Sequence, residues 1–233
     1  MPTRKYTKKR TYKKKTYKKR SYKKRNAIVK NPVNYIGFPK QQTVKMRYVS
    51  TFSLDLSAAA YQTHSFVCNS IFDPDAALGG HQPLGHDQWM AFYNHYTVLG
   101  AKCSVSLSGQ QATNPTPVLC AIFVSDDLTS AFDPIKLAEQ GRCRYKLLNG
   151  FNSINTLQLS NFYSAKKFFN VKDVKDNETR IGASFGSNPA EQAFFIIGAA
   201  TVDGSTLANQ EIHAIVTIDY IVSMSEPMEL PQS

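Results

Sequence analysis

The chain has 233 residues, of which 42% are hydrophobic, and its formal net charge is +11 at pH 7. This length is enough for one sizeable core, and the apolar content excludes a wholly disordered chain. No run of about 18 apolar residues occurs, which excludes a transmembrane helix. No apolar segment follows the first charges, which excludes a secretory signal. We therefore expect the protein in the cytosol or nucleus.

The positive charge is concentrated in the first 25 residues, MPTRKYTKKRTYKKKTYKKRSYKKR, which contain fourteen Lys and Arg and no acidic residue. The other fourteen of the 28 basic residues face 17 acidic ones in residues 26–233. This arm therefore carries +14 and the remainder −3. So uneven a distribution predicts a polyanionic partner.

The arm repeats a pentad of Ser or Thr, Tyr and three basic residues, at 11–15, 16–20 and 21–25. A five-residue spacing places the Tyr rings on no single face of a helix or strand. The arm has no Val, Leu, Ile or Phe to form a core, so we expect it to be disordered alone. Its cations suit phosphates, and its evenly spaced Tyr rings suit stacking on unpaired bases.

We expect the arm to bind single-stranded nucleic acid, and a solubilising tail or a nuclear-import signal is the alternative or additional role. The predicted nucleic-acid-binding residues are Arg4, Lys5, Tyr6, Lys8, Lys9, Arg10, Tyr12, Lys13, Lys14, Lys15, Tyr17, Lys18, Lys19, Arg20, Tyr22, Lys23, Lys24, Arg25, Lys45 and Arg47.

Lys45 and Arg47 belong to the clearest strand, residues 43–57, which follows a linker over residues 26–42. Val44, Met46, Tyr48, Phe52, Leu54 and Leu56 share one parity of this strand. Lys45 and Arg47 share the other parity with Thr51, Ser53 and Asp55. Such alternation places one face in a core and the other in water. The two cations therefore extend the anion-binding surface of the arm or are solvated strand charges.

The next segments are a strand over 61–69, a long Gly-, Pro- and Asp-rich loop over 71–85, and a short helix. Asp87 is the expected cap of that helix. Trp89, Phe92, Tyr93 and Tyr96 recur at the spacing of one helical face. A second helix is expected from Asp133 to Gly141, with Pro at its first position and Gly as its stop.

The remaining strands follow from alternation or from short apolar runs. They are expected at 97–108, with Leu99, Ala101, Cys103, Val105 and Leu107 on one side, and at 118–124, 142–148, 163–171, 193–202 and 211–224. Residues 172–192 are polar and are expected to form a loop. About eight strands with two short helices in the connections predict an all-β sandwich or barrel over residues 43–225, followed by a tail at 226–233.

The arm and one internal stretch carry a family resemblance. Residues 72–74 (FDP) are followed by residues 79–89 (GGHQPLGHDQW) and then by Phe92, Tyr93 and Tyr96. This stretch resembles the HQPxGxDQWxxFYxxY segment in capsid proteins of circular, Rep-encoding single-stranded DNA viruses, the circovirus-like group. The strand pattern over 43–224 agrees, so the resemblance covers nearly the whole chain.

The resemblance implies an eight-stranded antiparallel jelly roll of two four-stranded sheets and a shell of about sixty subunits. It implies that the arm faces the lumen and that residues 70–86 and 125–160 form the exterior and the subunit contacts. About sixty arms of fourteen charges would neutralise on the order of 840 phosphates. A virion location, a host-nuclear stage and a nuclear import receptor are further implications. The alternatives are a capsid of a small RNA or satellite virus and a cellular nucleic-acid-binding protein.

No catalytic residue, cofactor or metal site is expected. Gly182 to Gly186 matches the G-x-S-x-G nucleophile elbow, and Asp203 and His213 follow in hydrolase order, but no strand–helix context surrounds the motif. His81 and His86 lack the spacing of zinc ligands. The carboxylates of Asp73, Asp75, Asp126 and Asp127 are expected to be solvated rather than to hold a hard cation. Cys68, Cys103, Cys120 and Cys143 lack paired spacing, so we expect reduced, buried thiols.

Overall fold

The structure is a computed structural model, and the domain that follows residue 33 is described by itself. The described residues are 38–77, 79–109, 116–128, 139, 141–148, 155–175, 177, 179–207 and 211–229. The predicted arm, residues 1–25, and all but two residues of the helix predicted over 133–141 lie outside these ranges.

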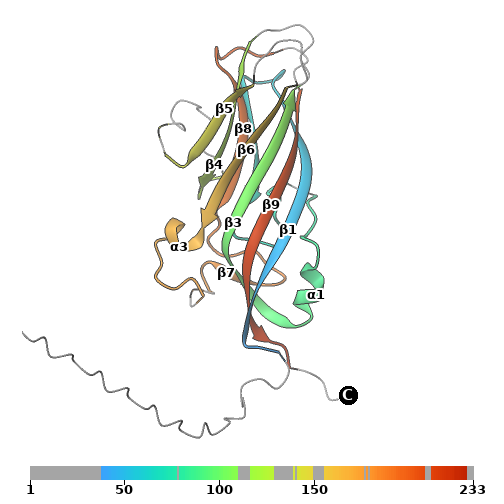
Figure 1. Cartoon of the computed structure of the whole chain (residues 1–233), viewed down its shortest axis with the longest axis vertical. Coiled ribbons are helices and arrows are strands. Elements are labelled where there is room, and N and C mark those ends of the chain that lie inside the picture. Colours follow the sequence, from blue (N-terminus) through green and yellow to red (C-terminus); the bar gives the residue numbers. More distant parts are fainter. Residues whose placement is uncertain are drawn as a thin grey trace, which may run out of the picture. The chain divides into compact units, whose positions relative to one another are not determined.

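The domain consists of two antiparallel sheets (Figure 1). The first has the order β1 (Gln41–Asp55), β9 (Glu211–Pro227), β3 (Tyr93–Gly109) and β6 (Asn155–Ser164), and the short β7 (Gly182–Ser184) also pairs with β3. The second has the order β2 (Tyr61–Val67), β8 (Phe194–Thr201), β4 (Val118–Ser125) and β5 (Cys143–Leu148). Two short helices, α1 (His86–Met90) and α3 (Ala165–Phe168), lie in the described connections.

When β7 is left aside, each strand lies in the other sheet from the strand that precedes it in the chain. The one exception among the described strands is β5, which lies next to β4 in the same sheet. When the eight long strands are numbered in chain order, the sheets read 1-8-3-6 and 2-7-4-5. This is the jelly-roll arrangement of two four-stranded sheets. The predicted all-β class is confirmed. The described residues contain eight long strands, as expected, but β6 is displaced from its predicted range, and β7 is an addition inside the segment predicted to be a loop.

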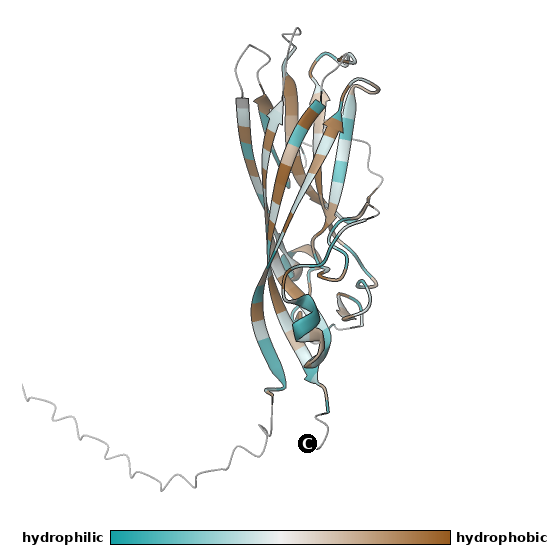
Figure 2. Cartoon of the chain, turned by 90° about the vertical axis from the view of Figure 1, so that its right-hand side faces the viewer, coloured by the Kyte–Doolittle hydropathy of each residue, from teal (hydrophilic) through white to brown (hydrophobic). Residues whose placement is uncertain are grey.

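The core fills the space between the sheets. Met46, Tyr48 and Leu54 of β1 are buried, whereas the alternate residues Lys45 and Arg47 are exposed, as their parity predicted. All eight residues of β8 are buried, which agrees with its prediction from a short apolar run, the pattern of a strand covered on both faces. Figure 2 shows the resulting alternation of hydrophobic and hydrophilic bands along the strands.

The helix predicted from Asp87 through Tyr96 is wrong in its second half. Helix α1 ends at Met90, its N-cap is Gly85 in the left-handed region (φ 89°), and no side chain caps it. From Tyr93 the chain is already β3, and Tyr96 pairs with Met224 of β9. Aromatic side chains favour strands when a partner strand is present. Pairing with β9 therefore overrides the local helical spacing.

Leu99 was predicted to point into the core with Ala101 and Cys103, and this is wrong. A register shift between Val98 and Gly100 leaves Leu99 without a partner residue in β9. This bulge reverses the alternation, so that Val98 is buried before it and Ala101 after it, while Leu99 is only half-buried. An extra residue of this kind is not visible in the sequence pattern.

The strand predicted over 163–171 is also wrong, because β6 ends at Ser164 and α3 follows at once. Phe168 and Phe169 of this turn pack on the ring of Tyr163 at 5.7 and 6.5 Å. The first half of β6, up to residue 160, falls within residues 125–160, the range that the resemblance assigned to the exterior and the subunit contacts. The inward side chains of β6, Leu159 and Tyr163, are buried.

Two long connections meet at one end of the sandwich through buried hydrogen bonds. The Tyr96 hydroxyl donates to the Ser187 carbonyl at 2.9 Å and lies 3.0 Å from the Ser70 hydroxyl. The Ser70 hydroxyl donates to Asn188 at 2.6 Å. Asn69 accepts a hydrogen bond from the backbone N–H of Ala193 at 3.0 Å. These bonds attach the loop after β2 to the loop before β8 and so order the connections around the core.

Candidate nucleic-acid interface

Of the predicted nucleic-acid-binding residues, only Lys45 and Arg47 lie within the described part of the chain. Both point outward from β1, at the end where the chain enters the domain. The register of the sheet places Lys45 beside Ile221 and then Gly100. The next exposed row contains Arg47, Asp219, Lys102 and Phe162, from four neighbouring strands. Four distant parts of the sequence therefore meet on one face.

Arg47 is not a free cation, because it forms a two-pronged ion pair with Asp219. Its Nε donates to Oδ1 at 2.6 Å, and its second nitrogen donates to Oδ2 at 3.1 Å. The side chains are 66% and 44% exposed. The hydrogen bond and the negative charge of Asp219 raise the pKa of the Arg47 guanidinium. Asp219 neutralises the charge that Arg47 brings to this face.

Lys45 and Lys102 supply the uncompensated charge. No ion pair of either lysine occurs among the described residues. The ammonium of Lys102 lies 5.6 Å from the centre of the Phe162 ring, a cation–π distance. A groove of about 480 Å³ runs between these residues, with Lys45, Gly100, Lys102, Phe162 and Ile221 in its lining. This end of the sheet therefore combines two cations with exposed apolar surface.

The charge of this outer face changes from positive to negative along the strands. At its far end Asp55 of β1 pairs in register with Glu211 of β9, and both are exposed. Asp55 is ten residues from Lys45, which corresponds to about 34 Å in an antiparallel strand. A polyanion is therefore attracted to the end of the face at the start of β1 and repelled from the other end.

Lys102 was not among the predicted binding residues, although the sequence contained a signal for it. Ala101 and Cys103 were predicted to point inward, so their neighbour Lys102 had to point outward. What the sequence lacked was the pairing of β3 with β9, which brings Lys102 into the row of Arg47.

The outer face of the second sheet is apolar at the end of the sheet where β2 begins. The register aligns Tyr61, Ala200, Leu119 and Leu147 across the four strands. Tyr61 is 48% exposed and Leu147 51%, and the nearby Tyr145 is 53% exposed. Contiguous exposed apolar groups of this kind mark contact surfaces. We call Tyr61, Leu119, Tyr145 and Leu147 the apolar row.

The loop after β2 carries the carboxylates considered as cation ligands. Asp75 lies 2.8 Å from Nε2 of His64, and the ring of His81 stacks on Tyr48 at 4.6 Å. Burial and the nearby charge of Asp75 raise the pKa of Asp73. Among the described residues no three His, Cys, Asp or Glu side chains converge as a metal site requires.

The geometry also separates the members of the hydrolase-like motif. Ser184 lies on β7 and pairs with His95 of β3, whereas His213 of β9 pairs with Ser108 of β3. These positions on β3 are thirteen residues apart, about 44 Å along the strand. The hydroxyl of Ser184 instead lies 2.8 Å from that of Ser187. Ser184 and His213 therefore cannot form a catalytic pair.

All four cysteines are free, as expected. Cys68, Cys103 and Cys120 are buried, whereas Cys143 is half-buried, so the prediction of buried thiols holds for three of them. Burial raises the pKa of the Cys120 thiol to about 12. None of the helices in the described part is long and apolar enough to span a membrane.

No protein-family model and no curated protein matches the sequence. Among solved structures, the 60-mer BFDV capsid protein is 13% identical, with a TM-score of 0.42 over 84% of this chain and 100% of that chain. The T=1 subviral particle of a Penaeus vannamei nodavirus capsid protein deletion mutant is 10% identical, with a TM-score of 0.44 over 80% and 98%. Turnip yellow mosaic virus is 12% identical, with a TM-score of 0.41 over 82% and 98%.

Proposed function

We propose that this chain is the capsid subunit of a small icosahedral virus and packages a single-stranded DNA genome through its basic arm. The observation that carries the proposal is the separation of charge: +14 in residues 1–25, joined to a jelly-roll domain of −3. The arm supplies affinity for a polyanion, and the nearly neutral domain is free to associate with copies of itself. The role is structural rather than enzymatic.

The arm binds by neutralising phosphates, and its Tyr rings stack on unpaired bases. Release of counterions from phosphate gives affinity without sequence preference, which suits a subunit that must coat an entire genome. Stacking on an aromatic ring contributes about 1–3 kcal/mol per base and requires exposed base faces. The pentad repeat therefore favours a single strand over a duplex.

The outer face of the five-stranded sheet faces the lumen in this proposal. Its positive end, with Lys45 and Lys102, lies near the start of β1, the strand that follows the arm and the linker in the sequence. A strand of nucleic acid held by the arm is thereby kept beside cations of the domain. The negative end, with Asp55 and Glu211, limits how far the strand spreads over this face.

Neighbouring subunits cover the apolar row of the second sheet. Tyr61, Tyr145 and Leu147 are each about half exposed in the single chain. Burial of apolar surface contributes about 25 cal/mol per Å², so covering these side chains favours association. Tyr145 and Leu147 fall within residues 125–160, which the family resemblance assigns to the exterior and to subunit contacts.

Electron microscopy of the purified full-length protein tests the proposal. The expected result is a uniform population of small closed particles that protect nucleic acid from added nuclease. Replacement of Leu147 by Asp should leave folded, unassembled subunits, whereas Val49→Asp, on the outer face of the other sheet, should leave assembly intact. A chain that remains monomeric while binding nucleic acid would overturn the capsid assignment and favour a cellular binding protein.

The type of genome is decided by digestion of the nucleic acid released from particles made in cells that replicate the genome. Sensitivity to deoxyribonuclease and to a single-strand-specific nuclease supports the proposed DNA. Sensitivity to ribonuclease would favour the RNA-virus alternative. Nuclear accumulation of a fluorescent fusion, lost when residues 1–25 are removed, would support the nuclear stage and the import receptor.

A further inference from the structure

The domain contains a second concentration of positive charge. Residues 141–172 include six Lys and Arg and no acidic residue. Because residues 26–233 carry −3 in total, the rest of that region carries −9. Strands β5 and β6 and helix α3 lie within this segment. So local an excess of cations on an acidic domain requires a reason beyond solubility.

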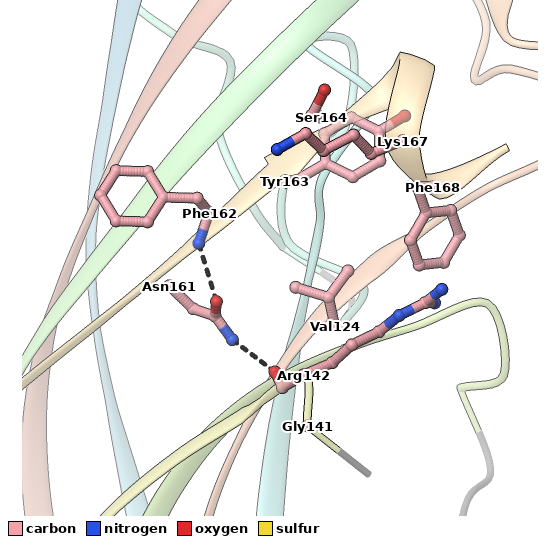
Figure 3. A pocket seen from close by; sticks show the side chains of 9 residues that line it. All are labelled: Val124, Gly141, Arg142, Asn161, Phe162, Tyr163, Ser164, Lys167 and Phe168. Carbon is pink, nitrogen blue, oxygen red and sulfur yellow. Dashed lines mark hydrogen bonds between the residues drawn. The ribbon is translucent and has the colours of Figure 1, made fainter. Parts of the chain in front are cut away.

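Phe162 lies within this segment, near the end of β6, and is exposed by 67%, the second highest value among the large hydrophobic side chains in the described part of the chain. It is the β6 member of the row that contains Arg47, Asp219 and Lys102. The backbone under it is held firmly. The Phe162 N–H donates to Asn161 Oδ1 at 2.9 Å, and Asn161 Nδ2 donates to the Arg142 carbonyl at 2.8 Å (Figure 3).

Cavities lie on both sides of Phe162. One is the groove that contains Lys45 and Lys102. The other is a cleft of about 340 Å³ between β6, α3 and the start of β5, shown in Figure 3. Arg142, Ser164, Lys167 and Phe168 are among its lining residues, and both cavities include Phe162 and Tyr163.

The second cleft is cationic as well as aromatic. The guanidinium of Arg142 lies 5.0 Å from the centre of the Phe168 ring. Lys167 also lines this cleft. Figure 3 shows the Arg142 guanidinium beside the Phe168 ring, whereas the Phe162 ring lies on the opposite side of the view. None of the lining residues of this cleft is acidic. An exposed ring is therefore flanked by cations in two separate cavities.

We propose that Phe162, Lys102, Arg142 and Lys167, which we call the Phe162 ledge, form a binding site for an unpaired nucleotide. The base stacks on the Phe162 ring. The phosphates on its two sides contact Lys102 in the groove and Arg142 with Lys167 in the cleft. The inference deepens the proposed function, on which it rests, by adding a site on the folded domain to the arm.

The combination of groups selects this ligand class. A partner that is only anionic would be bound by the cations and would leave the Phe162 ring in water. A duplex offers its phosphates but hides the faces of its bases. A single strand offers phosphates and base faces together, and Phe162 with its flanking cations matches both.

The test uses the full-length protein with a tryptophan at the ledge. The chain has one tryptophan, so Trp89→Phe gives a silent background for Phe162→Trp. The matched control is Ile215→Trp in the same background. Ile215 lies on the same outer face, is 54% exposed, and shares its row with Thr51, Ser106 and Gln158, none of which is charged.

Titration with an oligothymidylate should quench the fluorescence at position 162 at least several-fold more than at position 215. Polyphosphate, a polyanion without bases, should quench neither. In the unaltered chain, a 5-bromouracil oligonucleotide should crosslink to the peptide that contains Phe162, which keeps the test independent of the tryptophan variants. Replacement of Lys102 and Arg142 by Ala should lower that crosslink several-fold.

The outcomes separate the ledge from the arm. Tight oligonucleotide binding by anisotropy, with equal quenching at 162 and 215 and no crosslink at Phe162, would overturn the ledge and leave the proposed function standing. Equal quenching by polyphosphate would show an anion site without base stacking and would also overturn it. Failure of the full chain to bind any oligonucleotide would overturn both.

Discussion

Arg47 and Asp219 face each other across the β1–β9 pair, with the guanidinium Nε 2.6 Å from Oδ1 and a second nitrogen 3.1 Å from Oδ2. This ion pair divides the cations of the face into two kinds. Arg47 is neutralised by the protein itself, whereas Lys45 and Lys102 remain available to phosphate. The net charge at this end of the face therefore depends on the carboxylate of Asp219.

Replacement of Asp219 by Asn should tighten binding of a single-stranded oligonucleotide, because Arg47 is released and the face gains one positive charge. The slope of log affinity against log salt concentration should become steeper by about 0.7, the value for one additional phosphate contact on a single strand. A salt titration of affinity measures both effects. Glu211→Gln, at the far end of the same face, is the control and should change the slope little. An unchanged slope in Asp219→Asn would show that nucleic acid does not reach Arg47.

Deletion of residues 1–25 should weaken nucleic-acid binding strongly and flatten its salt dependence, because fourteen of the 28 basic residues are lost. The melting temperature of the unassembled remainder should barely change, because the sequence of the arm has no Val, Leu, Ile or Phe to contribute to a core. Affinity measured at several salt concentrations, together with thermal unfolding, tests both parts. A large fall in melting temperature would show that the arm is part of the fold.

Replacement of Tyr220 by Phe should destabilise the domain. The Tyr220 hydroxyl is fully buried and donates to the Val67 carbonyl at 2.8 Å, which joins β9 of one sheet to β2 of the other. Leaving a buried carbonyl without a partner costs about 1–3 kcal/mol. Urea unfolding of unassembled protein measures the loss.

The matched control is Tyr163→Phe. The Tyr163 hydroxyl is also buried, but it has no hydrogen-bond partner among the described residues. Its removal should leave the free energy of unfolding unchanged or raise it. Equal losses in the two variants would show that the hydroxyls act through packing rather than through the Tyr220 hydrogen bond.

Stability should fall at alkaline pH through the buried tyrosines. Burial raises the pKa of Tyr96 from its ordinary value of 10.0 to about 12. In the unfolded chain this phenol loses its proton at the lower pH, so the folded state binds more protons between the two values. The contribution of the protonated Tyr96 phenol to the free energy of unfolding is fully present below pH 10.0 and is lost as the pH rises through about 12.

Tyr96→Phe checks this assignment through the pH dependence of urea unfolding. The variant should be less stable at neutral pH, because it loses the bonds to Ser70 and Ser187. Its stability should nevertheless fall less steeply between pH 10 and 12 than that of the unaltered chain. Identical slopes would show that Tyr96 does not titrate in this range.

Local patterns were enough to predict the all-β class and four of its strands. Alternation predicted β1 and β9, which have one face in the core, and short apolar runs predicted β4 and β8. Alternation also placed Lys45 and Arg47 on the outside of β1. The prediction of secondary structure from local patterns failed where one stretch of sequence was compatible with both a helix and a strand. Tyr93 and Tyr96 have helical spacing with Trp89, yet pairing with β9 makes them part of β3.

By itself, the sequence determined the separation of charge between the arm and the domain and predicted a polyanionic partner, because composition does not depend on folding. Only the tertiary structure decided that Arg47, Lys102, Phe162 and Asp219 form one row. These residues lie on four strands that are distant in sequence, and their pairing depends on register across the whole sheet. The bulge at Leu99 shifts the register between β3 and β9. The position of such an extra residue depends on the partner strand, which the sequence of a single strand does not show.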